Sequence, residues 1–554
     1  MPDTRSLASP AGGRARPAGR TTRRITIAGA AMIAALAGSP MAGVPAASAS
    51  TGETVIVTAT GLLSPAAAVL SMGGTLLAQF HLINGVEAVI PAALEPLLDA
   101  LPGITVTPDV SVNVQATPES TGPHTPSDVF LGQTGATRLA AAGDTGHGVT
   151  VAVLDTGIDN LPDFAGRLIG GVDLTGANNP FQDSYGHGTF VAGLIAGNGT
   201  SSQGQYSGEA PGANLVSIKV AGANGTTDLV NLILGLQWAV DHRGSLGIKV
   251  LNMSLGFQSA LSTVVNPLDQ AAQAVWAAGI AVVVSAGNAG PFNGTILSPG
   301  DDPLVITVGA LDDMAATSAA GDEMADFSSA GPTWADGFAK PDLVTSGRSV
   351  VSLAAPGSTV YDANPSARVG PANFVGSGTS FSSAITSGAA ALVMAGNPGL
   401  TPNQLKARLL GTTSPGPVGN PFVDGHGALD AYAAATAGPM NLSQLAPLLP
   451  ALPGITIPLS PSGPAGTWNP SLWSGVTWTP GPSDDSPWPG RAWNGSDWNG
   501  FVWTGRAWNT GDWAGAAWNG TSWTGRAWND ADWAGSAFDG RAWNGSAWNS
   551  SAWN

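Results

Sequence analysis

The chain has 554 residues, of which 43% are hydrophobic and only 10% are charged, and its formal net charge is −17. This length exceeds that of one ordinary domain, and the negative charge excludes a broad basic surface, so we expect no nucleic-acid partner. The absence of cysteine excludes disulfides, thiolate nucleophiles and cysteine-ligated zinc. The 76 glycines and 42 prolines indicate many turns and linkers.

Residues 1–49 have the features of a secretory signal peptide. Basic residues that end in Arg23 and Arg24 precede a short apolar run, ITIAGAAMIAALAG, and small residues at 47–49 suit cleavage. A disordered basic tail is the alternative. The apolar run is too short to span a bilayer, and no other stretch approaches about 18 uninterrupted apolar residues. We therefore expect a secreted protein with no mature transmembrane segment, exported by the Sec or the Tat route.

Residues 50–120 alternate strand-like and helix-like patterns. The run TVIVTAT precedes the apolar run SPAAAVLSM, and the segment closes on ITVTPDVSVNVQ. Alternating period-2 and helical patterns within so short a segment predict a small α+β unit. An unrelated small domain and a segment that serves the next domain are both consistent with this pattern.

Residues 125–437 contain strand patterns separated by helix patterns. Nearly continuous apolar runs suit parallel strands that are buried on both faces. A helix pattern over 226–240 has Thr226 or Thr227 as its predicted N-cap, and another covers 267–279. The sum predicts an α/β domain with a doubly wound, mostly parallel sheet. The strand patterns are VTVAVL (149–154), LVSIKV (215–220), IKVLNMS (248–254), IAVVVS (280–285) and LVITVG (304–309).

The last two segments differ in composition from the rest. Residues 438–467 are rich in Pro, Leu and Ser and indicate a linker. In residues 468–554 tryptophan recurs every five residues, except at Ser483 and Phe538. Exposed aromatic platforms would suit stacking on sugar rings, so a cell-wall or glycan ligand is one hypothesis. Self-association and low-complexity filler are the alternatives.

Four polar residues are predicted to meet at one edge of the sheet. Asp155 directly follows VTVAVL, and Asn288 in SAGNAG follows IAVVVS. His187 in GHGT and Ser380 in GTS each open a helix pattern of small residues. In open α/β sheets, sites gather beyond the carboxyl ends of the strands, so these residues can converge.

Together these residue types suit nucleophilic catalysis. A serine hydroxyl needs a base to take its proton and a carboxylate to orient that base. His187 is the candidate base, Ser380 the nucleophile and Asp155 the orienting carboxylate. An asparagine amide such as that of Asn288 can donate to the negative charge of a tetrahedral intermediate. A carboxylate in a strand-end turn and a turn asparagine are the plainer interpretations of Asp155 and Asn288.

The chain resembles the subtilisin-like serine proteases (subtilases). The resemblance rests on the order Asp, His, Ser and on the segments VTVAVLDTGID, YGHGTFVAG and GSGTSFSSA. It implies a subtilisin-like fold over 125–437 and a secreted serine endopeptidase that acts through an acyl-enzyme. It also implies that residues 50–120 form an inhibitory propeptide, which makes the chain a zymogen. Proteins or peptides are the expected substrates.

The resemblance further implies a substrate site. Ser254, Leu255 and Gly256 resemble the family's substrate-binding strand. Ser285, Ala286 and Gly287 would form the opposite wall of the primary pocket, and both walls are small and neutral, which favours an apolar residue at P1. No cofactor is required. Calcium is frequent in the family, but apart from Asp163 its site is not evident, and no metal is assigned.

Two residues depart from the family pattern. Phe190 follows HGT where a second histidine is common, and Phe381 follows Ser380 where methionine is usual. These changes leave the local packing and the shape of the pocket open. The alternative function is a wall- or glycan-binding surface protein with a degenerate protease domain. The four intact catalytic candidates argue against degeneration.

Overall fold

The computed structural model describes residues 52–61, 63–114 and 126–438, together with two-residue strands between 492 and 548. The predicted signal peptide, almost all of the linker and most of the tryptophan repeat lie outside these residues. Within them, no helix is both long enough and apolar enough to cross a membrane.

Residues 52–114 begin with a small α+β unit that has its own core. Its four strands are antiparallel in the order β2-β3-β1-β4, and two short helices accompany them. Val55, Val57 and Val69 are among the residues of its buried core. The elements are β1 (Glu53–Ala59), α2 (Pro65–Ser71), β2 (Thr75–Phe80), β3 (Gly85–Ile90), α3 (Glu95–Asp99), β4 (Ile104–Pro108) and, beyond the sheet, β5 (Ser111–Asn113).

The larger unit is built on an eight-stranded sheet with the order β13-β12-β11-β10-β6-β8-β7, in which β14 also pairs with β12. All pairs are parallel except β12 with β13, so the predicted mostly parallel sheet is confirmed. The five predicted strands are present, with small differences at their ends. The strands are β6 (Thr150–Asp155), β7 (Leu168–Asp173), β8 (Asn214–Lys219), β10 (Ile248–Met253), β11 (Ala281–Ser285), β12 (Ile306–Asp312), β13 (Glu323–Met324) and β14 (Leu343–Ser346).

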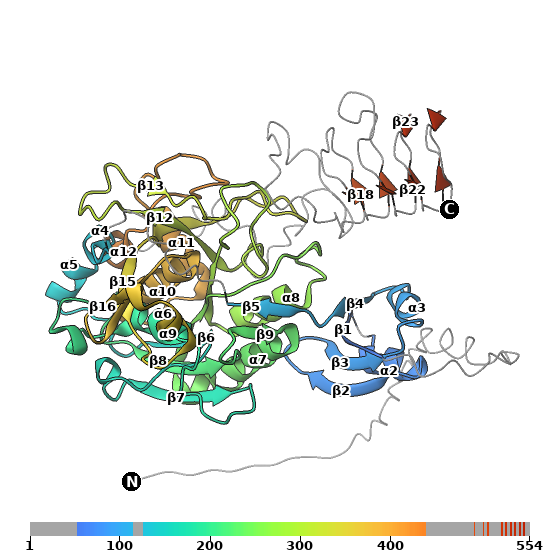
Figure 1. Ribbon diagram of the computed structural model, residues 1–554, viewed down its shortest axis with the longest axis horizontal. Coiled ribbons are helices and arrows are strands. Elements are labelled where there is room, and N and C mark those ends of the chain that lie inside the picture. The colour runs from blue at the N-terminus through green and yellow to red at the C-terminus, as the bar shows by residue number, and fades with distance from the viewer. Residues whose placement is uncertain are drawn as a thin grey trace, which may run out of the picture. The chain divides into compact units, whose positions relative to one another are not determined.

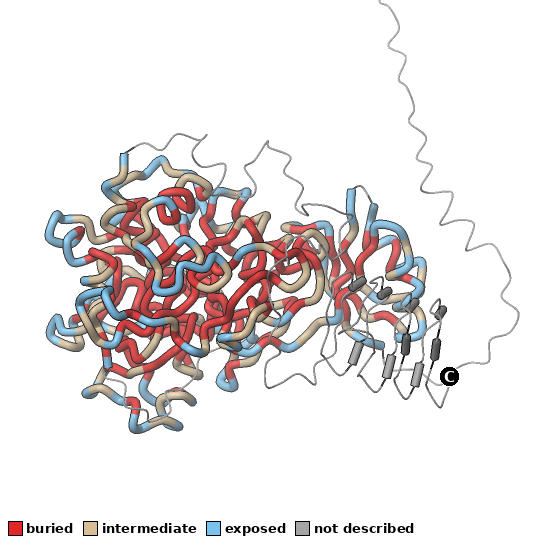
Figure 2. The backbone as a smooth tube through the Cα atoms, turned by 90° about the horizontal axis from the view of Figure 1, so that it is seen from above, coloured by how far each residue is buried: buried red, intermediate tan, exposed pale blue. Residues whose placement is uncertain are grey.

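Helices cover both faces of this sheet. Consecutive residues of a strand point to opposite faces. Leu154 of β6 lies beside Gly235 of α7, whereas the next residue, Asp155, faces α6. Helix α10 packs on α6 and on the central strands, whose residues are almost all buried (Figures 1 and 2). The main helices are α6 (His187–Ala196), α7 (Leu229–Leu246), α8 (Pro267–Ala277), α10 (Thr379–Gly396), α11 (Pro402–Gly411) and α12 (Ala431–Thr436).

Smaller elements complete the larger unit. Helices α4 (Phe130–Gln133), α5 (Ala136–Ala141) and α9 (Thr359–Ala363) lie in its connections. A second, three-stranded antiparallel sheet has the order β15-β17-β16. Its strands are β15 (Val350–Leu353), β16 (Arg368–Val369) and β17 (Asn373–Gly376).

The predicted N-cap of α7 is wrong. Thr226 and Thr227 belong to strand β9 (Thr226–Asp228), and Asp228 is the N-cap, accepting a hydrogen bond of 2.7 Å from Asn231 N. The reason is tertiary: β9 pairs antiparallel with β5 of the N-terminal unit. Thr226 and Thr227 pair with Asn113 and Val112, so the helix begins after them, and Asp228, the last residue of β9, has the side chain that accepts from the first turn.

Strands of the tryptophan repeat pair in parallel and in register. They are β18 (Ala492–Trp493), β19 (Val502–Trp503), β20 (Ala507–Trp508), β21 (Ser522–Trp523), β22 (Ala527–Trp528), β23 (Asp532–Trp533), β24 (Ala537–Phe538), β25 (Ala542–Trp543) and β26 (Ala547–Trp548). Trp493 is paired with Trp508, and Trp508 with Trp528, so partners lie three or four five-residue blocks apart. The separation of paired residues is therefore a multiple of the five-residue period of the sequence.

A buried cluster of charges ties α11 to the edge of the sheet. Asp342, directly before β14, accepts from Lys340 Nζ at 2.7 Å, from Thr307 N at 2.8 Å and from Lys406 Nζ at 3.0 Å. Burial alone would raise the pKa of Asp342, but the two ammonium groups outweigh it and hold this pKa below its ordinary value.

Asp342→Asn is therefore expected to destabilise the larger unit strongly, because it leaves two buried ammonium groups without their counter-ion. The expected loss is about 3–5 kcal/mol in the free energy of unfolding, measured by urea denaturation. The matched control is Asp362→Asn, which removes an exposed carboxylate lying 3.8 Å from Arg368 and should cost about 0–1 kcal/mol. Equal losses in the two variants would contradict the prediction.

Candidate active site

The structure brings Asp155 and His187 into direct contact. Asp155 is the last residue of β6 and His187 the first of α6. His187 Nδ1 lies 2.8 Å from Asp155 Oδ1 and 2.9 Å from Oδ2, and both side chains are 1% exposed. Gly188 allows this approach, since a Cβ there would collide with the carbonyl oxygen of Gly157. The contact orients the imidazole so that Nε2 points away from the carboxylate.

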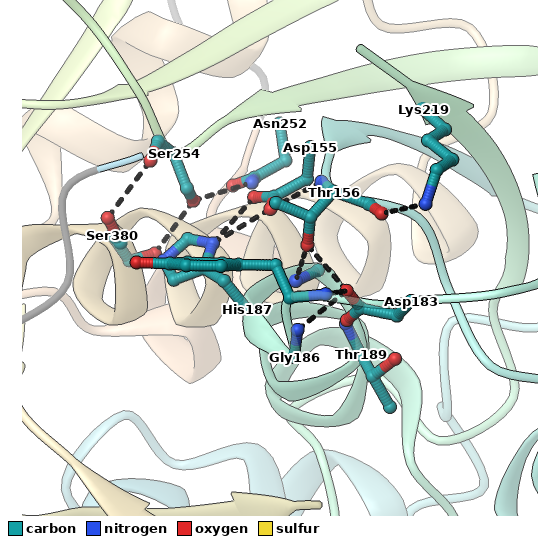
Figure 3. Close-up of polar contacts among 12 residues, drawn as sticks. Asp155, Thr156, Asp183, Gly186, His187, Thr189, Lys219, Asn252, Ser254 and Ser380 are labelled. Atoms are coloured by element: carbon teal, nitrogen blue, oxygen red, sulfur yellow. Dashed lines mark hydrogen bonds and ion pairs between the residues drawn. The ribbon is translucent and has the colours of Figure 1, made fainter. Parts of the chain in front are cut away.

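Ser380 lies in the first turn of α10 and is drawn together with Asp155 and His187 in Figure 3. Its hydroxyl donates to the carbonyl oxygen of Ser254 at 3.0 Å. His187 Nε2 is buried and has no hydrogen-bond partner among the described residues. The expected hydrogen bond from Ser380 to His187 is therefore not formed in this structure.

Asn288 is held by the start of α10. Its Oδ1 accepts from Thr379 N and from Thr379 Oγ1, each at 2.9 Å. Thr379 Oγ1 in turn accepts from Gly287 N at 3.1 Å. These donors identify the oxygen of the amide, so the NH₂ group is at its other end. Thr379 directly precedes Ser380, and its part in holding Asn288 could not be recognised from the sequence, where GTS is a common triplet.

The two predicted pocket walls follow neighbouring strands. Ser254 follows β10 and Ser285 ends β11, and these strands pair in the sheet. A Cβ on Gly287 would lie 2.8 Å from Cγ of Leu297, and one on Gly256 would lie 3.1 Å from its Cβ. Leu297 thus lies against both walls. The sequence reasoning missed it, because no motif marks a leucine in the connection between two strands.

Residues of the N-terminal unit occupy the edge predicted to bind substrate. Strand β5 pairs antiparallel with β9, and the next residue, Val114, forms an antiparallel bridge with Leu255. Val114 N also donates to Gly225 O at 2.9 Å. The chain at 111–114 therefore lies as an extended strand against the backbone of Leu255, one of the predicted substrate-binding residues.

The two departures from the family pattern form one contact. The rings of Phe190 on α6 and Phe381 on α10 have centroids 4.3 Å apart. The ring of Phe381 is also 5.7 Å from that of His187. Both phenylalanines are buried. They fill the space between the two helices with apolar atoms, and this packing gives the side of the imidazole next to Phe381 an apolar surface.

A carboxylate that the motifs did not single out lies behind the histidine. Asp183 is buried and its Oδ1 accepts from Gly186 N and Thr156 Oγ1, each at 2.7 Å, while Oδ2 accepts from Thr189 N at 2.7 Å (Figure 3). Burial raises the pKa of Asp183, and the charge of Asp155 acts in the same direction, whereas the three donors lower it. The sequence signal, an Asp four residues before a His, is too common to mark such a site.

The candidate calcium ligand is engaged by other groups. The carboxylate of Asp163 accepts from the backbone N–H and from the hydroxyl of Ser201. Among the residues that the structure describes, no three His, Asp or Glu side chains are arranged to hold a metal ion.

Comparison with known proteins gives consistent matches. The family model of the subtilase family matches residues 146–430. The serine protease AprX of Bacillus subtilis is 39% identical over 362 residues, which cover 64% of this chain and 79% of that protein. Subtilisin Savinase of Lederbergia lenta is 36% identical over 292 residues, which cover 53% of this chain and 92% of that protein.

A solved structure supports the fold independently. Fervidolysin from Fervidobacterium pennivorans, described as a keratinolytic enzyme related to subtilisin, matches with a TM-score of 0.56 at 24% identity. The match covers 71% of this chain and 62% of that chain. At this identity the likeness concerns the fold alone.

Proposed function

The chain belongs to the subtilase family and is a subtilisin-like serine endopeptidase, and we propose that Asp155, His187 and Ser380 are its catalytic triad. One observation carries this assignment. The bidentate contact of His187 Nδ1 with the buried carboxylate of Asp155 places the imidazole at the carboxyl end of the sheet, beside the helix that begins with Thr379 and Ser380.

In the proposed mechanism, the Ser380 hydroxyl turns from the Ser254 carbonyl to His187 Nε2. Ser380 Oγ attacks the substrate carbonyl carbon while Nε2 takes its proton. The C–N bond then breaks as the imidazolium returns that proton to the leaving amine. Water then attacks the acyl carbon while His187 takes its proton, the bond from that carbon to Ser380 Oγ breaks, and the imidazolium returns the proton to Oγ as the new acid leaves. Asp155 stabilises the imidazolium at each stage.

We assign the stabilisation of the oxyanion to Asn288. Thr379 holds the amide oxygen with two donors, so the NH₂ group is preorganised before substrate arrives. Preorganised donors are effective because they need no reorientation in the transition state. Ser254, Leu255, Gly256, Ser285, Ala286 and Gly287 are proposed as the substrate-binding backbone, with Leu297 limiting the depth of a pocket for apolar side chains.

The N-terminal unit is proposed as an inhibitory propeptide. An extended peptide can bind by pairing with exposed strand edges. Residues 111–114 already pair with β9 and with Leu255, so a substrate could not use those edges at the same time. Backbone N–H groups of His81 and Leu82 also donate to Gln237 Oε1 of α7, at 2.8 and 3.2 Å.

Several predictions stay outside this assignment. Secretion through residues 1–49, maturation by self-cleavage, and a wall or glycan ligand of residues 468–554 remain predictions from the sequence. The alternative of a binding protein with a degenerate protease domain is not favoured, because the matches concern the protease domain.

Ser380→Ala tests the proposal directly. The full-length wild-type chain should lose residues before about 118 on incubation and should react with a fluorophosphonate, whereas the variant should do neither. Intact mass and active-site labelling follow the two events. If neither chain reacts while both are folded and free of the N-terminal segment, the proposed triad is wrong.

Asp155→Asn is expected to lower kcat by about 10⁴-fold with little change in stability, because an uncharged amide supports the wrong tautomer of His187. The matched control is Asp159→Asn, which alters the neighbouring carboxylate that lies four residues along the chain and should lose far less. The measurement is peptide hydrolysis at saturating substrate. Near-wild-type turnover of Asp155→Asn would remove this residue from the triad.

Docking of the N-terminal unit is expected to weaken as pH rises. Burial raises the pKa of Asp109, and the charge of Asp228 in the protease unit raises it further. Burial also raises the pKa of Glu87, as do the charges of Asp109 and Asp228. The docked form therefore binds protons more tightly than the separated form. Docking is strongest below the ordinary carboxyl pKa of about 4 and weakens as pH rises through the raised values.

Hydrogen exchange in the Ser380→Ala chain measures this effect without self-cleavage. Protection factors of the β5 amides should fall with pH relative to those of β15, and Asp109→Asn should flatten the fall. Glu53→Gln, which alters an exposed carboxylate of the same unit, should leave the slope unchanged. A wild-type slope of zero would contradict the prediction.

A further inference from the structure

We propose that Asp183 is a positioning residue for His187, and this inference rests on the proposed triad. The Asp183 carboxylate holds the first turn of α6 against the end of β6. His187 on that turn therefore keeps its contact with Asp155, the last residue of the strand. Asp183 lies in the connection before α6, outside the quoted sequence motifs, and it does not touch the imidazole.

The hydrogen bonds of Asp183 reach both elements that carry the Asp155–His187 contact. From α6 it accepts the N–H groups of Gly186, the N-cap, and of Thr189, each at 2.7 Å. From the end of β6 it accepts the hydroxyl of Thr156, also at 2.7 Å. Tyr185 N is a further donor at 3.2 Å. His187 lies between two of these donors in the chain, so its backbone is fixed on both sides.

Thr156 completes the connection. Its hydroxyl donates to Asp183 and accepts from Gly188 N at 2.9 Å, and its own N–H donates to Asp155 Oδ1 at 2.8 Å. One threonine is therefore bonded to the carboxylate that contacts the imidazole, to the helix that carries the imidazole, and to Asp183. Lys219 Nζ holds the Thr156 carbonyl at 2.8 Å.

This pattern requires a carboxylate rather than an amide. Donors approach both oxygens of Asp183, and each oxygen has a backbone N–H donor that cannot accept, that of Gly186 on Oδ1 and that of Thr189 on Oδ2. In Asp183→Asn one of the two positions becomes an NH₂ group facing a backbone N–H, so either the bond to Thr189 or the bond to Gly186 is lost. The substitution also removes a buried negative charge near the imidazole.

Two measurable effects follow. Loosening the first turn of α6 should misplace Nε2, and misplacement of a catalytic group by about 1 Å costs on the order of 10²-fold in rate. We expect kcat to fall by about 10–100-fold while KM changes by less than about threefold, since Asp183 does not lie on the substrate edges. The acid limb of the kcat/KM profile should move to lower pH, because the protonated imidazole loses a nearby negative charge.

The other charged groups that face this site remain in every variant. They are Asp155, Asp159, whose Oδ1 accepts from Asp183 N at 2.7 Å, and Lys219. Tyr185 is a further titratable side chain close to them, and Asp155 and Asp183 contribute to raising its pKa after the larger effect of burial. None of them is altered by the substitutions proposed here, so a displaced acid limb reports the removal of Asp183.

The experiment measures kcat, KM and the pH profile of full-length, self-matured enzyme, with active sites counted by fluorophosphonate labelling. Asp424→Asn is the matched control. Asp424 is also a buried carboxylate that accepts backbone N–H groups, those of Val418, Gly419 and Asn420, but in a loop without contact to the triad. It should lower stability and leave kcat per active site and the acid limb unchanged.

Thr156 supplies a second pair of variants should Asp183→Asn fail to fold. Thr156→Val removes the hydroxyl and should lower kcat by about tenfold, and Thr156→Ser keeps it and should restore kcat to within about twofold of wild type. The inference is overturned if Asp183→Asn keeps kcat per active site and the acid limb of wild type. It is also overturned if Thr156→Val and Thr156→Ser are equally active. If Ser380→Ala still hydrolyses peptides, the proposed triad is wrong. This result differs from the Asp183 and Thr156 results, which test only the positioning role.

Discussion

The buried contact between Asp155 and His187 is the interaction on which the proposed site depends. A carboxylate removed from water is costly unless donors replace the water. Asp155 receives Thr156 N at 2.8 Å as well as the imidazole. These groups come from the end of β6 and the start of α6, which meet only because β6 lies inside a parallel sheet, between β8 and β10. The chemistry is thus tied to the topology.

Parallel strands explain how much of the molecule could be predicted from its sequence. Buried strands need apolar side chains on both faces, and this need produces the runs that predicted β6, β8, β10, β11 and β12. Asp155 ends β6 and Asn288 lies three residues beyond the end of β11, so both lie at the carboxyl edge of the sheet for the same reason. Helices α6 and α10 begin where their glycine-flanked motifs indicated.

What could not be predicted depends on contacts between distant segments. The N-cap of α7 was misplaced because Thr226 and Thr227 pair with β5, more than a hundred residues away in the chain. Asp183, Asp342 and Leu297 look in the sequence like any loop aspartate or leucine, and only their partners distinguish them. Phe190 and Phe381 appeared as two separate departures, whereas the structure makes them one packed pair. Contacts between residues that are far apart in the chain leave no pattern in the local sequence.

The two carboxylates near His187 have complementary environments. Asp155 binds the imidazole directly and can stabilise its protonated form. The oxygens of Asp183 are occupied by N–H and O–H donors, so Asp183 does not compete for the imidazole proton and acts through position and charge. The other side of the ring is different again. Phe381 presents an apolar surface there, and Nε2 has no partner among the described residues. A base that accepts a proton from a serine needs this nitrogen accessible to the serine hydroxyl, and the N–H and O–H donors bound by Asp183 are not directed at it.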